Sequence, residues 1–100
     1  MSSEKKTDKT KLIEKLQDDI EKASWEMLKD HHERGAVFLV DSKLELATVG
    51  AAIALDEVNL VKIWLDNGEF KKLETIPEDV DHKERTIDFL IVQPYVLIQP

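Results

Sequence analysis

The stretch LATVGAAIALDEVNLVKIWLDNGEFKKL, residues 46–73, decides the fold because the ends of three consecutive elements can be recognised in it. Residues 46–55 are almost uncharged and rich in small side chains, which predicts a buried helix. Asp56 is a favoured N-cap residue and predicts a second helix over residues 57–66. After an Asn-Gly pair that ends this helix, we expect a strand at residues 69–73.

The segment before this stretch predicts a helical region and then a strand. Apolar residues recur every three or four positions over residues 12–27, and charged residues occupy the opposite side. Ser24 is a candidate cap, so we expect either one long helix or two helices with a kink near Ser24, ending at Gly35. Residues 36–40 (AVFLV) are apolar on both alternating faces and predict a central strand that is buried on both sides.

The segment after this stretch predicts two further strands. Residues 75–85 are the most charged part of the chain, and we expect there a short helix over residues 77–83 or a plain loop. Residues 87–92 (IDFLIV) predict a strand. Pro94 has no backbone N–H to donate and marks a bulge or an edge position before a last strand at residues 95–98 (YVLI).

These elements predict a single α+β domain. Residues 1–9 are polar and charged and are expected to form a disordered tail, and residues 10–100 are expected to form the domain. We expect four or five helices on a small, three-stranded, mostly antiparallel sheet. The order of the helices and strands is similar to that of winged-helix regulators, so a winged-helix-like topology is the first expectation.

The composition excludes several kinds of function. The chain has 14 basic and 21 acidic residues and a net charge of −7, which argues against a nucleic-acid partner because such partners require phosphate neutralisation. It has no cysteine, so a disulfide framework and a thiolate nucleophile are excluded. The longest stretch without charge, residues 89–100, is shorter than the roughly 20 residues of a membrane span. With no secretory signal in residues 1–9, we expect a cytoplasmic protein without a membrane partner.

Three segments that occur in a fixed order resemble a known family. They are residues 20–37, 44–68 and 92–99, which contain Trp25, Arg34-Gly35, Trp64 and Pro94-Tyr95. Over about residues 12–99 the chain resembles the small bacterial domain of unknown function family 2288, found in cyanobacteria and proteobacteria. It departs from the family pattern at His32-Glu33, where an aromatic and a small residue are usual, and at Tyr95, where tryptophan is usual. The family has no established activity, so the resemblance implies neither catalytic residues nor a cofactor.

The sharpest cluster of polar side chains is Asp30-His31-His32-Glu33-Arg34. The adjacent His31 and His32 project about 100° apart on a helix and therefore do not face one metal ion. We predict no metal site there, and an ion pair between Asp30 and Arg34. If a ligand binds at this cluster, we expect an anion or a carboxylate held by His31 and Arg34.

No arrangement of residues predicts catalysis. The serines and threonines lie in no nucleophile motif, and the isolated glycines form no phosphate-binding loop; Gly50 is expected to allow close helix packing. Asp56 is interpreted as a helix cap and Asp88 as the solvent-facing residue of an edge strand. We therefore predict no catalytic residues and no cofactor.

The favoured hypothesis is a non-enzymatic protein-interaction or regulatory module that associates with a protein partner or with itself, through an edge strand near residues 92–98. Trp25, Trp64 and Tyr95 are the candidate interaction residues, although tryptophans on such helices are more often core anchors. One alternative is a winged-helix-like DNA-binding regulator, but its reading helix and following strand carry no net charge. The other is a small ligand-binding protein or enzyme that uses the histidine–arginine pair.

Overall fold

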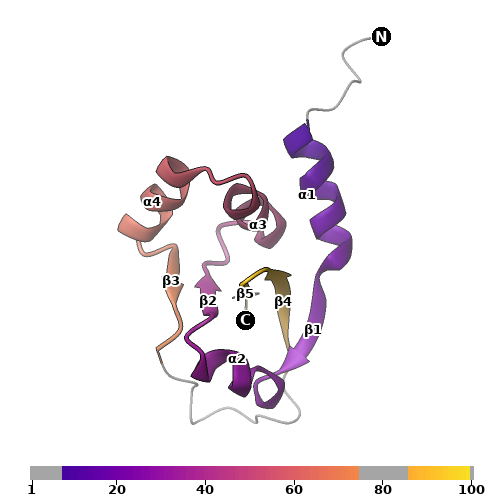
Figure 1. Cartoon of the computed structure of the whole chain (residues 1–100), viewed down its shortest axis with the longest axis vertical. Helices are drawn as coiled ribbons and strands as arrows, with labels where there is room; N and C mark the ends of the chain where they lie inside the picture. Colours follow the sequence, from indigo (N-terminus) through magenta and orange to yellow (C-terminus); the bar gives the residue numbers. More distant parts are fainter. Residues whose placement is uncertain (1–7, 75–85, 100) are drawn as a thin grey trace.

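Ten elements follow one another in the computed structural model, which describes residues 8–74 and 86–99 (Figure 1). In chain order they are α1 (Asp8–Asp19), β1 (Glu21–Ser24), the 3-10 helix η2 (Glu26–Leu28), α2 (Lys29–Glu33), β2 (Val37–Val40), α3 (Leu46–Ala54), α4 (Val58–Asp66), β3 (Phe70–Lys72), β4 (Thr86–Val92) and β5 (Tyr95–Gln99). The helices expected at residues 46–55 and 57–66 are confirmed. The helix or loop expected at residues 77–83 lies outside the described residues, as do residues 1–7.

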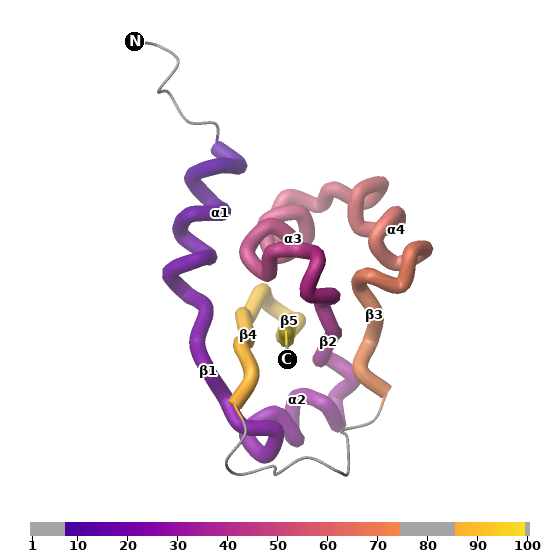
Figure 2. The backbone as a smooth tube through the Cα atoms, turned by 180° about the vertical axis from the view of Figure 1, so that it is seen from behind, coloured from indigo at the N-terminus to yellow at the C-terminus, as the bar shows by residue number. Residues whose placement is uncertain are grey.

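The strands form one five-stranded mixed sheet in the order β1-β4-β5-β2-β3, which Figure 2 shows from one edge to the other. The α+β class is therefore confirmed, and the expected three-stranded, mostly antiparallel sheet is wrong. β2 lies parallel to β5, with Phe38 opposite Leu97, and antiparallel to β3. β4 is antiparallel to both β5 and β1. The strand expected at residues 36–40 is interior, as predicted.

The winged-helix-like topology is not found. In that topology the two strands after the helix pair would form a hairpin. Here β3 pairs with β2 at one edge, and β4 pairs with β1 and β5, so two strands separate β3 from β4.

β1 was not expected from the sequence. Residues 21–24 (EKAS) were expected to be helical, but Ala23 is 2% exposed and pairs with Ile87 of β4. Lys22 contacts Asp88 across the two strands at 2.8 Å. Neither one long helix nor two helices with a kink near Ser24 is found, because α1 ends at Asp19 and β1 separates it from η2. The Ser24 hydroxyl does accept a hydrogen bond from the Met27 N–H, at 3.4 Å, where η2 begins.

β4 and β5 are interior strands, which corrects three expectations. β4 lies between β1 and β5, so Asp88 is not on an edge strand. β5 lies between β4 and β2, so residues 92–98 offer no free strand edge for self-association. Pro94 lies at neither a bulge nor an edge: it follows a cis peptide bond from Gln93, in the tight turn where Val92 pairs with Tyr95.

One face of the sheet is covered by α3, which lies between α1 and α4 (Figure 1). The core on this face includes Leu16, Trp64, Leu90 and Leu97. Gly50 is so close to the sheet that an added Cβ would lie 2.8 Å from the Leu90 Cδ2 atom, so the expected close packing at Gly50 is confirmed. No helix in residues 8–74 and 86–99 combines the length and the apolar composition that crossing a membrane requires.

The opposite face of the sheet has a second core, to which η2 contributes. Trp25 and Leu28 pack there with Val37, Val96 and Ile98. Alternate residues of β2 and β5 belong to the two cores, because successive side chains of a strand point to opposite faces. The two cores explain why the strand expected at residues 36–40 is apolar toward both faces of the sheet.

The connection between α3 and α4 differs from the expected one. Asp56 does not cap α4: the N-cap is Glu57, without a side-chain hydrogen bond. Instead Asp56 follows the C-terminus of α3 with φ of 58°, and its N–H donates to the Ile53 carbonyl at 3.1 Å. The Glu57 N–H donates to the Ala52 carbonyl at 2.9 Å, which completes a Schellman motif in the position usually taken by glycine.

Candidate functional site

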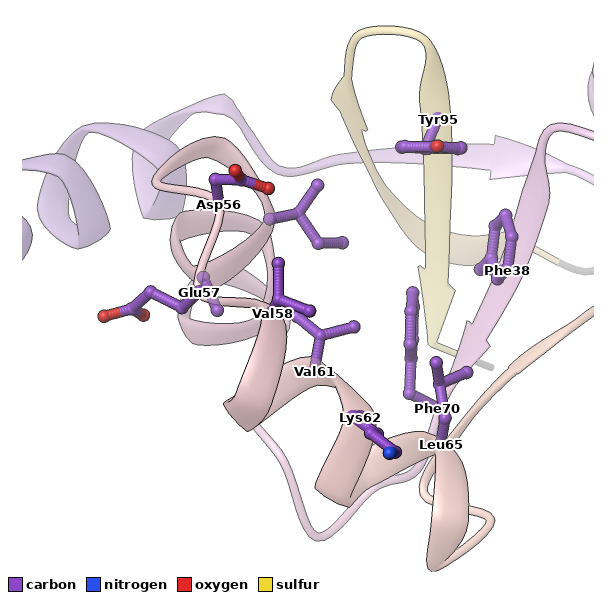
Figure 3. Close-up of a pocket in the computed structure, with 11 residues that line it drawn as sticks. Phe38, Asp56, Glu57, Val58, Val61, Lys62, Leu65, Phe70 and Tyr95 are labelled. Carbon is purple, nitrogen blue, oxygen red and sulfur yellow. The ribbon is translucent and has the colours of Figure 1, made fainter.

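An open groove of about 490 Å³ lies between α4 and the neighbouring strands β3, β2 and β5 (Figure 3). Its floor is a row of aromatic rings from three neighbouring strands: Phe70 of β3, Phe38 of β2 and Tyr95 of β5. Phe38 stacks on Phe70, with ring centroids 5.1 Å apart, and meets Tyr95 edge-on at 5.4 Å. These contacts order the floor of the groove, since offset-stacked and edge-on ring pairs are the favoured geometries.

The wall of the groove is one side of α4. Val58, Val61, Lys62 and Leu65 line it, and the spacing i, i+3, i+4, i+7 places these side chains together on a helix. Figure 3 shows Val58 and Val61 pointing toward the aromatic floor. Val58 is 62% exposed and Leu65 is 46% exposed, so the wall is an apolar surface open to solvent.

α4 has more apolar residues than it buries. Six of its nine residues are apolar (Val58, Leu60, Val61, Ile63, Trp64 and Leu65), yet only Trp64 is buried. Ile63, on another side of the helix, is 54% exposed. The three polar residues Asn59, Lys62 and Asp66 share one side of the helix at the spacing i, i+3, i+7. The rest of its circumference is apolar, and α4 therefore exposes apolar side chains outside its polar side.

Two charged side chains mark the ends of the groove. Asp56 lies at one end and Lys62 toward the other (Figure 3). Within residues 8–74 and 86–99, neither side chain makes an ion pair or a hydrogen bond. Glu57 also lines the groove, but its carboxylate points away from the floor and contacts Lys9 at 2.8 Å.

The histidine–arginine pair expected from the sequence lies elsewhere. His31 and Arg34 are brought together at the end of α2, where Arg34 Nη2 lies 2.5 Å from His31 Nδ1. The predicted ion pair between Asp30 and Arg34 does not form, because the guanidinium is turned to the imidazole. Neither His31 nor Arg34 lines the groove, and Arg34 is exposed. A ligand at this pair stays a prediction.

The described part of the chain also contains no group of three or more His, Asp or Glu side chains that could hold a metal ion. Of the three candidate interaction residues, Tyr95 lies in the groove and is 39% exposed. Trp25 and Trp64 are 4% and 8% exposed and belong to the two cores.

The other groove residues were not expected from the sequence to lie together. The signal that was available is the high apolar content of α4, six residues of nine. The aromatic row carried no local signal, because Phe38, Phe70 and Tyr95 meet only through the strand order.

The fold and the groove define a small α+β protein built on a five-stranded mixed sheet, with an apolar surface beside one helix. The family model described as "Protein of unknown function (DUF2288)" matches residues 11–100, and the chain belongs to this family. The resemblance seen in the sequence is thus confirmed.

The chain is also similar to PA1075 from Pseudomonas aeruginosa, whose solution structure was determined by NMR. The two chains are 31% identical, with a TM-score of 0.70 over 96% of this chain and 88% of the other. None of the curated proteins matches this sequence.

Proposed function

We propose that this chain is a non-enzymatic, cytoplasmic protein-interaction module that contacts its partner through the groove beside α4. One observation carries the proposal: six of the nine residues of α4 are apolar, although only Trp64 is buried. Val58, Leu65 and Tyr95 are exposed around one hollow, and contiguous apolar surface of this kind is typical of protein interfaces. Burying it against a partner would stabilise the complex by roughly 25 cal/mol per Å² of apolar area.

The groove favours a protein over DNA. In a DNA-binding regulator α4 would be the reading helix, but Lys62 is its only basic residue, and the acidic Asp66 follows it one turn later. A reading helix needs several groups that bind phosphates or base edges. An aromatic floor with an apolar wall instead suits the apolar side chains of a protein partner.

Two matched variants test the proposal. Leu65 in the groove and Ile91 on β4 are both 46% exposed. Leu65→Gln and Ile91→Gln therefore replace equally exposed apolar side chains, one inside the groove and one outside it. Proteins that copurify with the tagged chain from its host cell are quantified by mass spectrometry for wild type and both variants. We expect the partner to be retained by Ile91→Gln and to fall at least about tenfold with Leu65→Gln, as for a central contact. Equal retention by both variants would contradict the proposal.

A further inference from the structure

The dimensions of the groove match an α-helix. Its floor crosses three neighbouring strands, which places the outer two, β3 and β5, about 10 Å apart. Its wall extends from Val58 to Leu65, a rise of about 10.5 Å or two helical turns. Because an α-helix with its side chains is about 10 Å across, two turns of one helix would cover the floor. A single extended strand, about 5 Å wide, would cover half of it.

The backbone of the floor also favours a helix. β2 and β5 are each paired on both sides, so they offer an extended peptide no backbone hydrogen bonds. The nearest free edge is β3, which has three residues and carries Lys71 and Lys72, the kind of residues that protect a strand edge. A helix satisfies its own backbone and needs from the groove only apolar contact.

The charges of the groove give the bound helix a direction. An acid of the occupant is favoured beside Lys62 and a base beside Asp56, because neither side chain has a partner among the described residues. A helix is itself stabilised by an acid in its first turn and a base in its last turn. A helix running antiparallel to α4 meets both conditions, since its N-terminal side then lies toward Lys62 and its C-terminal side toward Asp56.

We propose that the groove binds two turns of an amphipathic helix of a partner protein, antiparallel to α4, with an acid at the N-terminal end and a base at the C-terminal end of these two turns, beside an apolar stripe. This inference rests on the proposed function.

A second copy of this chain fits the groove less well. In an antiparallel pair of α4 helices, Asp66 at the C-terminus of one would approach Asp56 and Glu57 before the other. This arrangement brings acids together at both ends of the pair, and each chain already carries a net charge of −7. Repulsion between like charges therefore favours a different partner over a dimer.

Two fluorescent synthetic peptides of about 18 residues, long enough to form a helix, test the proposal against the purified full chain. Both carry one leucine stripe; in the matched peptide a Glu precedes a Lys by seven positions, about 10.5 Å, on the central two turns, and the reversed peptide has the two exchanged. By fluorescence anisotropy we expect the matched peptide to bind about tenfold more tightly, since two exposed ion pairs each contribute a few-fold. Lys62→Glu should remove this preference, and Asp56→Asn, which tolerates the left-handed backbone, should reduce it to about threefold.

The control is Lys71→Glu, which makes the same change of charge on β3, outside the groove lining. It should leave the preference unchanged, and because the same peptides are used throughout, their own helicity cancels between protein variants. Equal binding of both peptides by wild type, an unchanged preference in Lys62→Glu, or no binding of either peptide would overturn the helix proposal. So would a dimer in light scattering that Leu65→Gln abolishes. The copurification result for Leu65→Gln would still decide the proposed function separately.

Discussion

Replacement of Gly50 by alanine tests how closely α3 lies on the sheet. An added Cβ would meet Leu90 Cδ2 at 2.8 Å, Val92 Cγ2 at 3.2 Å and Leu16 Cδ1 at 3.4 Å. Unstrained carbon–carbon contacts are about 3.5–4.0 Å, so Leu90 would have to retreat by at least about 0.7 Å. Leu90 is 1% exposed, and the other two contacts come from β4 and α1, so the neighbouring packing leaves it little room.

The expected effect of Gly50→Ala is the sum of two opposing contributions. Inside a helix, alanine is favoured over glycine by about 1 kcal/mol. Overpacking a closed core costs about 1–3 kcal/mol, and three close contacts place this site in the upper part of that range. We therefore expect Gly50→Ala to lower the free energy of unfolding by about 1–2 kcal/mol, and Tm by at least about 4 °C.

Urea denaturation followed by circular dichroism measures this change. Ala54→Gly is the control, because Ala54 is exposed at the end of the same helix. Its effect measures the difference in helix propensity between alanine and glycine where no core packing changes. It should destabilise the chain by at most about 1 kcal/mol. If Gly50→Ala were instead more stable than wild type by about 1 kcal/mol, the close approach of α3 to β4 would be refuted.

Three further substitutions test the local geometry by urea denaturation. Gly68→Ala should cost about 1 kcal/mol from the backbone alone, because Gly68 has φ of +75° and nothing within 4 Å of an added Cβ; no loss would contradict the left-handed turn. Asp56→Gly should raise the free energy of unfolding by up to about 1 kcal/mol, because glycine adopts φ of 58° without strain; a lower free energy of unfolding would contradict the strained backbone at Asp56. The same substitution should weaken binding of the matched peptide. Gln99→Met should cost about 1–2 kcal/mol, because the Gln99 amide donates to the Asp41 and Leu44 carbonyls at 2.9 and 2.6 Å; an unchanged midpoint would show that this tether does not stabilise the fold.

The parts of the fold that local patterns determine were predictable. α3 and α4 follow from an uncharged run and an apolar helix whose ends are marked near Asp56 and Gly68. β2 follows from a short run that is apolar on both faces. The role of Asp56 was misassigned, because aspartate is favoured both at helix N-caps and, after glycine and asparagine, in the left-handed backbone.

The parts that depend on distant pairing were not predictable. β1 has one buried residue, Ala23, and exists because β4 pairs with it across more than 60 positions of the sequence. The parallel pairing of β2 with β5 made β5 an interior strand, although Pro94 suggests an edge. The groove has the same origin: its wall is visible in the composition of α4, whereas its floor depends on the strand order.

The most direct test of the central claim is photo-crosslinking in the host cell. A photoreactive amino acid replaces Val58, which lines the groove and is 62% exposed, or Met27, which lies on η2 and is 65% exposed. If the apolar side of α4 is the contact surface, the chain with the probe at Val58 forms a discrete crosslink to a second protein, and the chain with the probe at Met27 does not. Crosslinks of equal yield from both positions, or from Met27 alone, would contradict the claim that α4 and the aromatic row form the recognition surface.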